Sequence, residues 1–344
     1  MTEPGFRVSD FDYHLPPDLI AQTPSETRGA SRLLDLDRAT GAPTDRMFAE
    51  LPGLVPAGDL LILNSTKVRH ARLIGWRPSG RPAEVLLIHP AADGCWIAMG
   101  KPGSALKPGK RIALGETAAI ETVEVLDGPN RLVRFIGITA EAAMTAYGQL
   151  PLPPYITREP TQADDDRYQT VYAERPGSVA APTAGLHFTP AILAELAANG
   201  VGIGKLDLEV GPGTFRPLEG DDPATHPMHR ESFTISAELV DRIRATQASG
   251  GAIWAVGTTV VRALESAATE AGVAVGPQET TLLILPGFRF QVVDRLITNF
   301  HLPRSTLLML VSAFGGGPEI RAAYRHAVDQ RYRFYSYGDA MVVR

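Results

Sequence analysis

The sequence predicts an α/β protein in which a larger layered α/β domain carries a small inserted β domain. Two observations lead to this prediction. Between residues 70 and 137, short β-rich pieces are separated by turns rich in Gly, Pro and Asn, which is typical of a small sandwich or barrel. After the proline-rich segment 150–154, strand-like and helix-like patterns alternate, which is typical of a layered α/β domain with mostly parallel strands.

The strand at 59–63 and the β pieces after it indicate where the inserted domain begins and ends. An apolar run at 59–63 predicts a buried strand that ends in the polar turn Asn64-Ser65-Thr66. The predicted β pieces of the insertion then lie at 71–74, 84–88, 95–99, 111–114, 122–126 and 132–136. We therefore expect residues 67–144 to form the inserted domain, and residues 1–66 and 145–344 to form the α/β catalytic domain.

The elements after the insertion alternate in type. Thr189, Pro190 and Gly200 mark the start and end of a helix at about 190–199. The following patterns predict strands at 201–210, 252–256 and 281–285, and helices at 238–248, 260–268, 305–314 and 319–330. Ligands in such sheets bind beyond the carboxyl ends of the strands, so the turns that follow the strands are the candidate sites.

Charge is distributed unevenly along the chain. The net charge is −5, yet residues 66–111 hold nine Lys and Arg residues against Glu84 and Asp93. A basic segment on an acidic protein is typical of docking to an anionic partner, and Trp76 and Trp96 within it are residues on which bases can stack. The alternative is a solvated basic surface with tryptophans in the core.

Composition also limits the class of protein. A single cysteine, Cys95, excludes an internal disulfide and a cysteine-cluster metal site. The longest apolar stretch, at about 307–314, is too short to cross a bilayer, and no secretory leader is evident. We expect a cytoplasmic protein that makes no membrane contact and acts as a monomer.

A loop of small residues before one histidine is the first candidate site. Residues 180–185 are all Ala, Pro, Thr or Gly, and His187 follows them. Small residues let the backbone approach a ligand closely, and the imidazole is the group in this loop suited to acid–base chemistry. The alternative is a tight loop that leads into the helix at 190–199.

A second candidate lies between the strand at 252–256 and the next helix. Gly257, Thr258 and Thr259 offer backbone N–H groups and two hydroxyls, which favour an anion such as a carboxylate. Arg262 lies on the helix that follows. The turn lacks the lysine of a phosphate-binding loop and the glycine spacing of a dinucleotide fold, and its alternative role is chain reversal.

Two further clusters contain histidine. His226 and His229 are three residues apart beside Glu231. A metal site would need further ligands, and none accompanies them in the sequence, so acid–base or hydrogen-bonding use is the preferred interpretation. Residues 298–306 form a polar turn that includes Asn299 and His301, with turn formation and packing as the alternative role.

The last segment of interest, residues 333–341, combines aromatic, hydroxyl and carboxylate groups near a glycine. This combination suits a purine or a sulfonium held against aromatic faces. It also suits a terminal strand that packs into a core, and the sequence leaves both interpretations open.

Taken together, these segments resemble the S-adenosylmethionine:tRNA ribosyltransferase-isomerase family of queuosine biosynthesis. Two of the matching runs are Asn64-Ser-Thr-Lys-Val68 and Val179-Ala-Ala-Pro-Thr-Ala-Gly-Leu-His-Phe188. The others lie in order at 11–22, 31–34, 71–73, 151–156, 168–172, 210–215, 226–231, 256–266, 298–303 and 332–341. The resemblance therefore spans nearly the whole chain.

The resemblance implies a fold and a reaction. It implies that the inserted domain is a β-barrel attached to the larger α/β domain. The family transfers and isomerises the ribosyl part of S-adenosylmethionine onto 7-aminomethyl-7-deazaguanine at the tRNA wobble position, and the products are epoxyqueuosine, adenine and methionine. S-adenosylmethionine is then a consumed substrate, and neither a cofactor nor a metal is expected.

The demands of this reaction assign roles to the candidate residues. Proton transfer beside the sulfonium and at the departing adenine needs a base and an acid, and the candidates are His187, His229, Asp339, Glu231 and His301. The expected substrate-binding residues are Thr183, Gly185, Gly211, Gly213, Thr214, Gly257, Thr258, Thr259, Arg262, Asn299 and Tyr337. The expected tRNA-binding residues are Lys67, Arg69, Arg72 and Lys101.

Three positions depart from the family pattern. Glu209 stands where a histidine is usual, Arg230 replaces a serine and His70 replaces a proline. Glu209 and Arg230 would favour the first alternative function, a catalytically altered tRNA-binding paralogue. A second alternative is an S-adenosylmethionine-dependent RNA methyltransferase, although no glycine-rich loop is evident near the first strand. A third is an RNA-binding module without activity.

Overall fold

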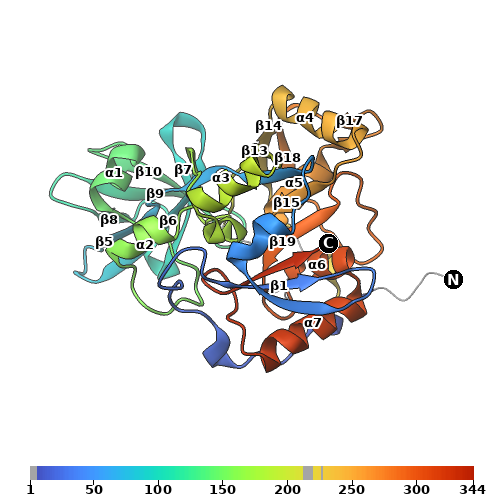
Figure 1. Cartoon of the computed structure of the whole chain (residues 1–344). Coiled ribbons are helices and arrows are strands. Elements are labelled where there is room, and N and C mark those ends of the chain that lie inside the picture. The colour runs from blue at the N-terminus through green and yellow to red at the C-terminus, as the bar shows by residue number, and fades with distance from the viewer. Residues whose placement is uncertain (1–5, 212–219, 226–227) are drawn as a thin grey trace.

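The computed structural model describes residues 6–211, 220–225 and 228–344, and in these residues nine strands form the main sheet. Figure 1 shows this sheet with its helices on one side of the molecule and a β-barrel on the other. The sheet order is β18-β14-β13-β3-β15-β19-β20-β1-β2. In that order the strands span Gly276–Thr280, Glu231–Ile235, Gly202–Leu208, Leu60–Asn64, Ile253–Val256, Arg295–Asn299, Ala340–Val343, Arg32–Leu36 and Pro43–Met47.

The sheet is mixed, so the prediction of mostly parallel strands is wrong. The neighbours β13, β3, β15 and β19 run parallel, as do β20 and β1. The pairs β18–β14, β14–β13, β19–β20 and β1–β2 are antiparallel. The C-terminal strand β20 lies between β19 and β1, and this long-range pairing leaves no local pattern in the sequence.

Alternate residues of the strands face two cores. Leu60, Ile62 and Leu296 face one core, which is covered by the helices α4 (Ala237–Ala248), α5 (Thr258–Ser266), α6 (Thr306–Gly315) and α7 (Gly317–Asp329). Leu61 and Ile297 face the opposite core, together with α3 (Pro190–Ala198). This alternation follows from the two-residue period of a strand and makes the sheet a middle layer.

The inserted segment forms a closed antiparallel barrel of six strands within the described residues. Its order is β5-β6-β7-β10-β9-β8, and β8 pairs back onto β5. In that order the strands span Arg72–Trp76, Pro82–Pro90, Trp96–Lys101, Arg131–Ile136, Ala119–Val125 and Arg111–Ala113. Helix α1 (Ala140–Tyr147) and strand β11 (Gly148–Gln149) follow, and β11 pairs with β5.

Smaller elements link the barrel to the rest of the chain. Strand β4 (Thr66–Val68) pairs in parallel with β12 (Arg175–Ser178), and helix α2 (Gln162–Arg167) precedes β12. A hairpin of β16 (Ala268–Thr269) and β17 (Gly272–Val273) follows α5. Among the described residues, no helix is long and apolar enough to cross a membrane.

Most of the predicted elements are present, and one predicted strand is wrong. All six β pieces of the insertion are strands, and the five helices predicted after it form close to their predicted ends. Residues 281–285 are irregular, because the edge strand β18 ends at Thr280. In the main sheet, the strands β1, β2, β14, β18, β19 and β20 are additional to the prediction. Of these, β1, β19 and β20 are buried along nearly their whole length, so they lack the alternation of a half-exposed strand.

Candidate active site

A central pocket lies where the strands β15 and β19 end. Gly257 follows β15, and Asn299 is the last residue of the neighbouring parallel strand β19. The pocket therefore lies at the carboxyl ends of parallel strands, where such sheets place their ligands. Six of the sequence-predicted site residues line it: Thr183, Gly257, Thr258, Thr259, Asn299 and His301.

The start of α5 forms a wall of the pocket whose backbone groups suit an anion. Gly257 is the N-cap of α5 with φ +95° and ψ 152°, a conformation that is essentially restricted to glycine. No side chain caps the helix there, so its first N–H groups are available to a ligand. Together with the positive end of the helix dipole, these groups favour a carboxylate.

Aromatic and hydroxyl groups complete the pocket, and sequence reasoning did not select them. The ring centroids of Tyr155 and Tyr335 are 4.6 Å apart, and the Tyr155 hydroxyl is hydrogen-bonded to the Ser336 hydroxyl. The segments 151–156 and 333–341 indicated this wall, but nothing local showed which of their side chains would face the pocket. The additional lining residues with hydroxyl groups are Tyr155, Thr298, Ser305, Tyr335 and Ser336.

Tyr335 has a backbone conformation that is rare for an aromatic residue. Its φ is +71°, in the left-handed region that bulky residues seldom adopt. The conformation is held by two backbone bonds, Tyr335 N–H to Phe300 O (3.2 Å) and Gly338 N–H to Tyr335 O (2.9 Å). Strain of this kind concentrates at ligand sites, and here it accompanies a ring that lines the pocket.

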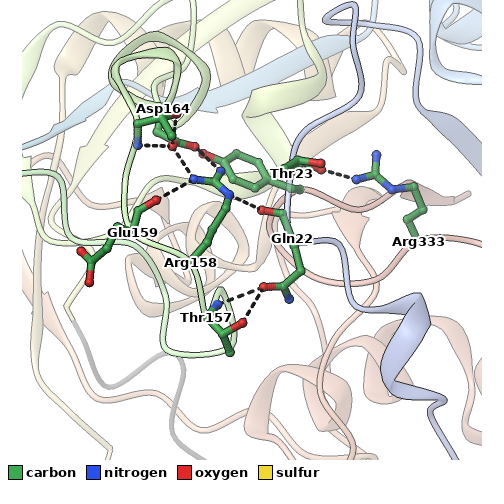
Figure 2. A network of polar contacts seen from close by, with 9 residues as sticks. Gln22, Thr23, Thr157, Arg158, Glu159, Asp164 and Arg333 are labelled. Atoms are coloured by element: carbon green, nitrogen blue, oxygen red, sulfur yellow. Dashed lines mark hydrogen bonds and ion pairs between the residues drawn. The ribbon is translucent and has the colours of Figure 1, made fainter.

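The segment that carries Tyr155 is held in place by the network in Figure 2. The Gln22 side chain donates to Tyr155 O (2.8 Å) and accepts from Thr157 N–H (2.9 Å). Arg158 donates to Gln22 O (3.0 Å) and forms two 2.7 Å bonds with Asp164. These bonds hold the pocket wall against the N-terminal part of the chain.

None of the described residues that line the pocket carries a formal charge. His301 is a lining residue, and burial lowers its pKa to about 3, so its ring is neutral at neutral pH. Its Nε2 is hydrogen-bonded to Thr298 Oγ1 at 2.8 Å. Within the described residues, Nδ1 has no hydrogen-bond partner.

His187, the leading histidine of the sequence analysis, lies behind the pocket wall. Its Nδ1 is 2.7 Å from Ser31 Oγ and its Nε2 is 3.0 Å from Asn299 Nδ2. Burial, with a smaller contribution from the Arg28 charge, lowers its pKa to about 3. Both ring nitrogens are therefore engaged within the protein, and the pocket is lined by Asn299 instead.

Two predicted carboxylates are also engaged in the structure. Asp339 accepts from the backbone N–H groups of Arg32 and Arg333, both at 2.8 Å, and burial raises its pKa although these bonds oppose the change. Glu231 forms a buried ion pair with Arg262 on α5. Neither carboxylate lines the central pocket.

Two predicted substrate-binding residues, Tyr337 and Gly185, do not line the central pocket. Tyr337 donates a hydrogen bond to Asp164 at 2.6 Å. Gly185 packs so closely against Tyr172 that an added Cβ would clash with the tyrosine hydroxyl. Gly185 is therefore enclosed by Tyr172, whereas Tyr337 lines a smaller pocket that also includes Ser31 and His187.

The remaining predicted residues either lie outside the pocket lining or fall outside the described residues. Gly211 directly follows Val210, a lining residue. His229 is exposed just before β14. Gly213, Thr214 and His226 lie outside the described residues.

Of the predicted tRNA-binding residues, the two arginines are already partnered. Arg72 is paired with Glu84 and Glu159, at 2.9 and 3.0 Å. The Arg69 guanidinium lies 3.8 Å from Glu209 and over the ring of Trp96.

The two predicted lysines, unlike the two arginines, have no carboxylate partner among the described residues. Lys67 on β4 and Lys101 on β7 are exposed, and neither forms an ion pair with a described residue. In the same basic segment Trp76 is 56% exposed, whereas Trp96 is part of the barrel core. The exposed groups of the segment therefore include these two lysines and one indole ring, together with Arg81, Lys107, Lys110 and Arg111.

The three departures from the family pattern each have a side-chain partner. Besides the Glu209–Arg69 pair, Arg230 pairs with Glu279 (2.9 Å) and His70 lies 2.9 Å from Asp165. None of the three lines the central pocket. In the described ranges, no group of three or more His, Cys, Asp or Glu side chains has the arrangement of a metal site.

Comparisons with known proteins agree along the whole chain. A family model described as queuosine biosynthesis protein matches residues 8–343. The S-adenosylmethionine:tRNA ribosyltransferase-isomerase of Thiobacillus denitrificans is 51% identical over 336 residues, 97% of this chain and 96% of that protein. The protein of the same name from Anaeromyxobacter sp. is 50% identical over 343 residues, 98% and 99% of the two chains.

A solved structure is also similar. The crystal structure of S-adenosylmethionine tRNA ribosyltransferase from Thermotoga maritima matches with a TM-score of 0.57 and 37% sequence identity. The match covers 98% of this chain and 100% of that one. The barrel and the layered sheet are therefore a shared architecture.

Proposed function

This chain belongs to the queuosine biosynthesis protein family, and we propose that its central pocket is where the family's S-adenosylmethionine:tRNA ribosyltransferase-isomerase reaction takes place. The chain transfers and isomerises the ribosyl part of S-adenosylmethionine onto 7-aminomethyl-7-deazaguanine at the wobble position of tRNA. Adenine and methionine leave, and epoxyqueuosine remains on the tRNA. The observation that carries the assignment of the site is a pocket that joins a helix N-terminus to aromatic walls at the strand ends.

The pocket suits the charges of S-adenosylmethionine. The N–H groups that begin α5 at Thr258 and Thr259 would hold the methionine carboxylate. The rings of Tyr155 and Tyr335 would face the sulfonium, because aromatic faces attract cations. The described residues of the pocket walls carry no formal charge. They therefore neither repel the sulfonium nor neutralise its charge with a counter-ion, and the sulfonium stays reactive.

His301 is the first choice for proton transfer in this pocket. The sulfonium acidifies the neighbouring ribose carbon, and a base must remove a proton there. His301 has a neutral imidazole whose Nδ1 is unpartnered among the described residues, and a bound sulfonium would keep it neutral. His229 beside β14 is the second choice, whereas Glu231 and Asp339 are held by Arg262 and by backbone N–H groups.

The basic barrel is the proposed docking surface for tRNA. Lys67 and Lys101 are exposed and have no described carboxylate partner, so they can contact phosphates. The exposed ring of Trp76 offers a stacking surface on the same barrel. Arg69 and Arg72 would have to exchange their present carboxylate partners for phosphates. We propose that residues 67–144 act as the tRNA-docking domain and residues 1–66 and 145–344 as the catalytic domain.

A product assay tests the function. The purified protein is incubated with S-adenosylmethionine and an anticodon stem-loop that bears 7-aminomethyl-7-deazaguanine, and products are identified by mass spectrometry. We expect free adenine, free methionine and a stem-loop that contains epoxyqueuosine. S-adenosylhomocysteine with a methylated stem-loop would indicate the methyltransferase instead. Folded protein without turnover would favour the altered paralogue, and a stem-loop with unmodified guanine is the matched control.

A further inference from the structure

Two buried polar atoms at the central pocket have no hydrogen-bond partner in the described part of the chain. They are Asn299 Oδ1 and Thr259 Oγ1, and both residues line the pocket. Asn299 is 2% exposed and Thr259 is 7% exposed. Buried polar groups in native proteins are nearly always satisfied, so a pair of unsatisfied atoms at one pocket points to a ligand that completes them.

The contacts of the Asn299 NH2 group fix the orientation of the side-chain amide. Nδ2 lies 3.1 Å from the carbonyl oxygen of Tyr335 and 3.0 Å from His187 Nε2. A carbonyl oxygen can only accept a hydrogen bond, so the NH2 group must be the end that faces it. The remaining end, Oδ1, is therefore a hydrogen-bond acceptor that the described residues leave unused.

The same geometry shows which ring nitrogen of His187 carries the proton. Nδ2 of Asn299 donates to Nε2, which places the single ring proton on Nδ1, where it is donated to Ser31 Oγ at 2.7 Å. The ring is 5% exposed and packs against Phe48, with centroids 5.1 Å apart. Burial holds the pKa of the ring at about 3, so this arrangement persists across the neutral range.

We propose that Ser31, His187 and Asn299 form a hydrogen-bonded relay that holds Asn299 Oδ1 as the acceptor for an uncharged donor of the nucleoside part of S-adenosylmethionine. That donor is the adenine amino group or a ribose hydroxyl. The proposal rests on the proposed function and deepens it. Asn299 contacts the substrate, and His187 and Ser31 are positioning residues that act through it.

The surroundings of Asn299 favour an uncharged donor over the methionine ammonium. An ammonium held by a neutral amide in a buried wall would lose its hydration without a counter-charge. No described carboxylate lines the pocket, and Glu231 is already paired with Arg262. An amino or hydroxyl group of the nucleoside is uncharged, so it avoids this penalty. It also donates the hydrogen bond that Oδ1 lacks.

Substrate analogues and variants test the contact at Asn299. Dissociation constants are measured for S-adenosylmethionine, its 6-deamino analogue and its 2′-deoxy and 3′-deoxy analogues, with an unreactive stem-loop that carries guanine at the wobble position. We expect wild type to bind one of these analogues about 10–100-fold more weakly than the substrate. In Asn299→Leu we expect no such penalty, because the variant lacks the Oδ1 atom that would accept a hydrogen bond from the group missing in the analogue. A penalty for the 6-deamino analogue identifies the adenine amino group, and one for a deoxy analogue identifies a ribose hydroxyl.

Substitutions of His187 test the relay. His187→Gln keeps an acceptor for Asn299 and a donor for Ser31, so we expect substrate affinity and kcat within about threefold of wild type. His187→Phe removes both bonds, and we expect it to weaken binding about tenfold or more, with the pH profile of kcat unchanged in shape. His326→Phe on α7, which lines no part of the pocket, is the matched control. Thermal unfolding verifies that each variant is folded.

Three results would overturn the proposal. One is a loss of kcat by a factor of about 10² or more in His187→Gln with unchanged affinity, which would make His187 an acid–base group. Another is an analogue penalty that persists in Asn299→Leu for every analogue. The third needs no variant: wild type binds all of the analogues as tightly as the substrate. Failure of the proposed function would differ from these, because wild type would then release no adenine and methionine from S-adenosylmethionine.

Discussion

At the scale of single residues, His187 and His301 share a buried environment but differ in what their nitrogens contact. Both nitrogens of His187 are bonded, whereas only Nε2 of His301 has a partner among the described residues. For both rings, burial lowers the pKa from 6.5 to about 3. The two histidines are therefore neutral at neutral pH, and the hydrogen bonds of the pocket depend on that neutrality.

This neutrality predicts a pH-dependent stability. Between about pH 6.5 and pH 3 the unfolded chain binds a proton at each histidine and the folded chain does not, so the free energy of unfolding falls as pH falls. Each group contributes a slope of roughly 1.4 kcal/mol per pH unit in this window. Urea unfolding of wild type and His187→Gln at several pH values within the window should show a shallower slope in the variant. Equal slopes would contradict a buried neutral His187.

At the scale of elements, the turn between β15 and α5 shapes the wall proposed to bind the methionine carboxylate. Gly257 turns the chain with a φ that other residues resist, and the helix starts without a side-chain cap. The end of the neighbouring strand β19 carries Asn299, and His301 follows it. Two strand ends that lie side by side in a parallel pair thus bring a helix N-terminus and a polar turn to one pocket.

Gly257→Ala tests this element. Alanine at this backbone conformation costs about 1–3 kcal/mol, and relief of the strain would move the N–H groups of Thr258 and Thr259. We expect a rise of about tenfold in the KM for S-adenosylmethionine, because a displaced helix N-terminus holds the carboxylate poorly.

Gly250→Ala is the control for this variant. Gly250 follows α4 with φ +80° and has open space around it, so the substitution also introduces alanine at a positive φ, but away from the pocket. It should lower the free energy of unfolding and leave KM unchanged. Equal effects of the two variants on KM would argue against the anion-binding role of α5.

At the scale of the whole molecule, the proposed tRNA-docking surface and the central pocket lie in different regions of the chain. The basic segment lies on the barrel strands and on β4, and the central pocket lies at the strand ends of the main sheet. The proline-rich segment 151–160 connects the two regions: Tyr155 lines the pocket, while Pro154 and Ile156 line a cavity shared with Arg72 and Lys101 of the barrel. A tRNA bound on the barrel would therefore lie beside the wall of the pocket.

The double variant Lys67→Ala/Lys101→Ala tests this division. Loss of two phosphate contacts should weaken binding of the anticodon stem-loop about tenfold at low salt and reduce the slope of log K against log salt by about 2. The KM for S-adenosylmethionine should stay at the wild-type value. Lys107→Ala/Lys110→Ala removes the same charge from other exposed positions of the barrel segment and is the matched control. Equal losses in both double variants would indicate only a general charge effect.

Local patterns determined a large part of this protein. The periods of the apolar residues predicted the six barrel strands, the helices after the barrel and the strands β3, β13 and β15, because each depends on neighbours in the sequence. Turn chemistry at Gly257 and at 298–301 located two walls of the pocket. These features are encoded by adjacent residues and need no knowledge of the rest of the fold.

The tertiary structure alone decided which side chains act together. Ser31 and His187 are 156 positions apart and His187 and Asn299 are 112 apart, so no local pattern could reveal their bonds. Within 333–341, the left-handed conformation at Tyr335 accompanies a ring that lines the pocket, whereas Tyr337, the residue chosen from the sequence, bonds to Asp164. Side-chain direction in a loop and partnership across a core are set by packing between distant segments, which residue order does not display.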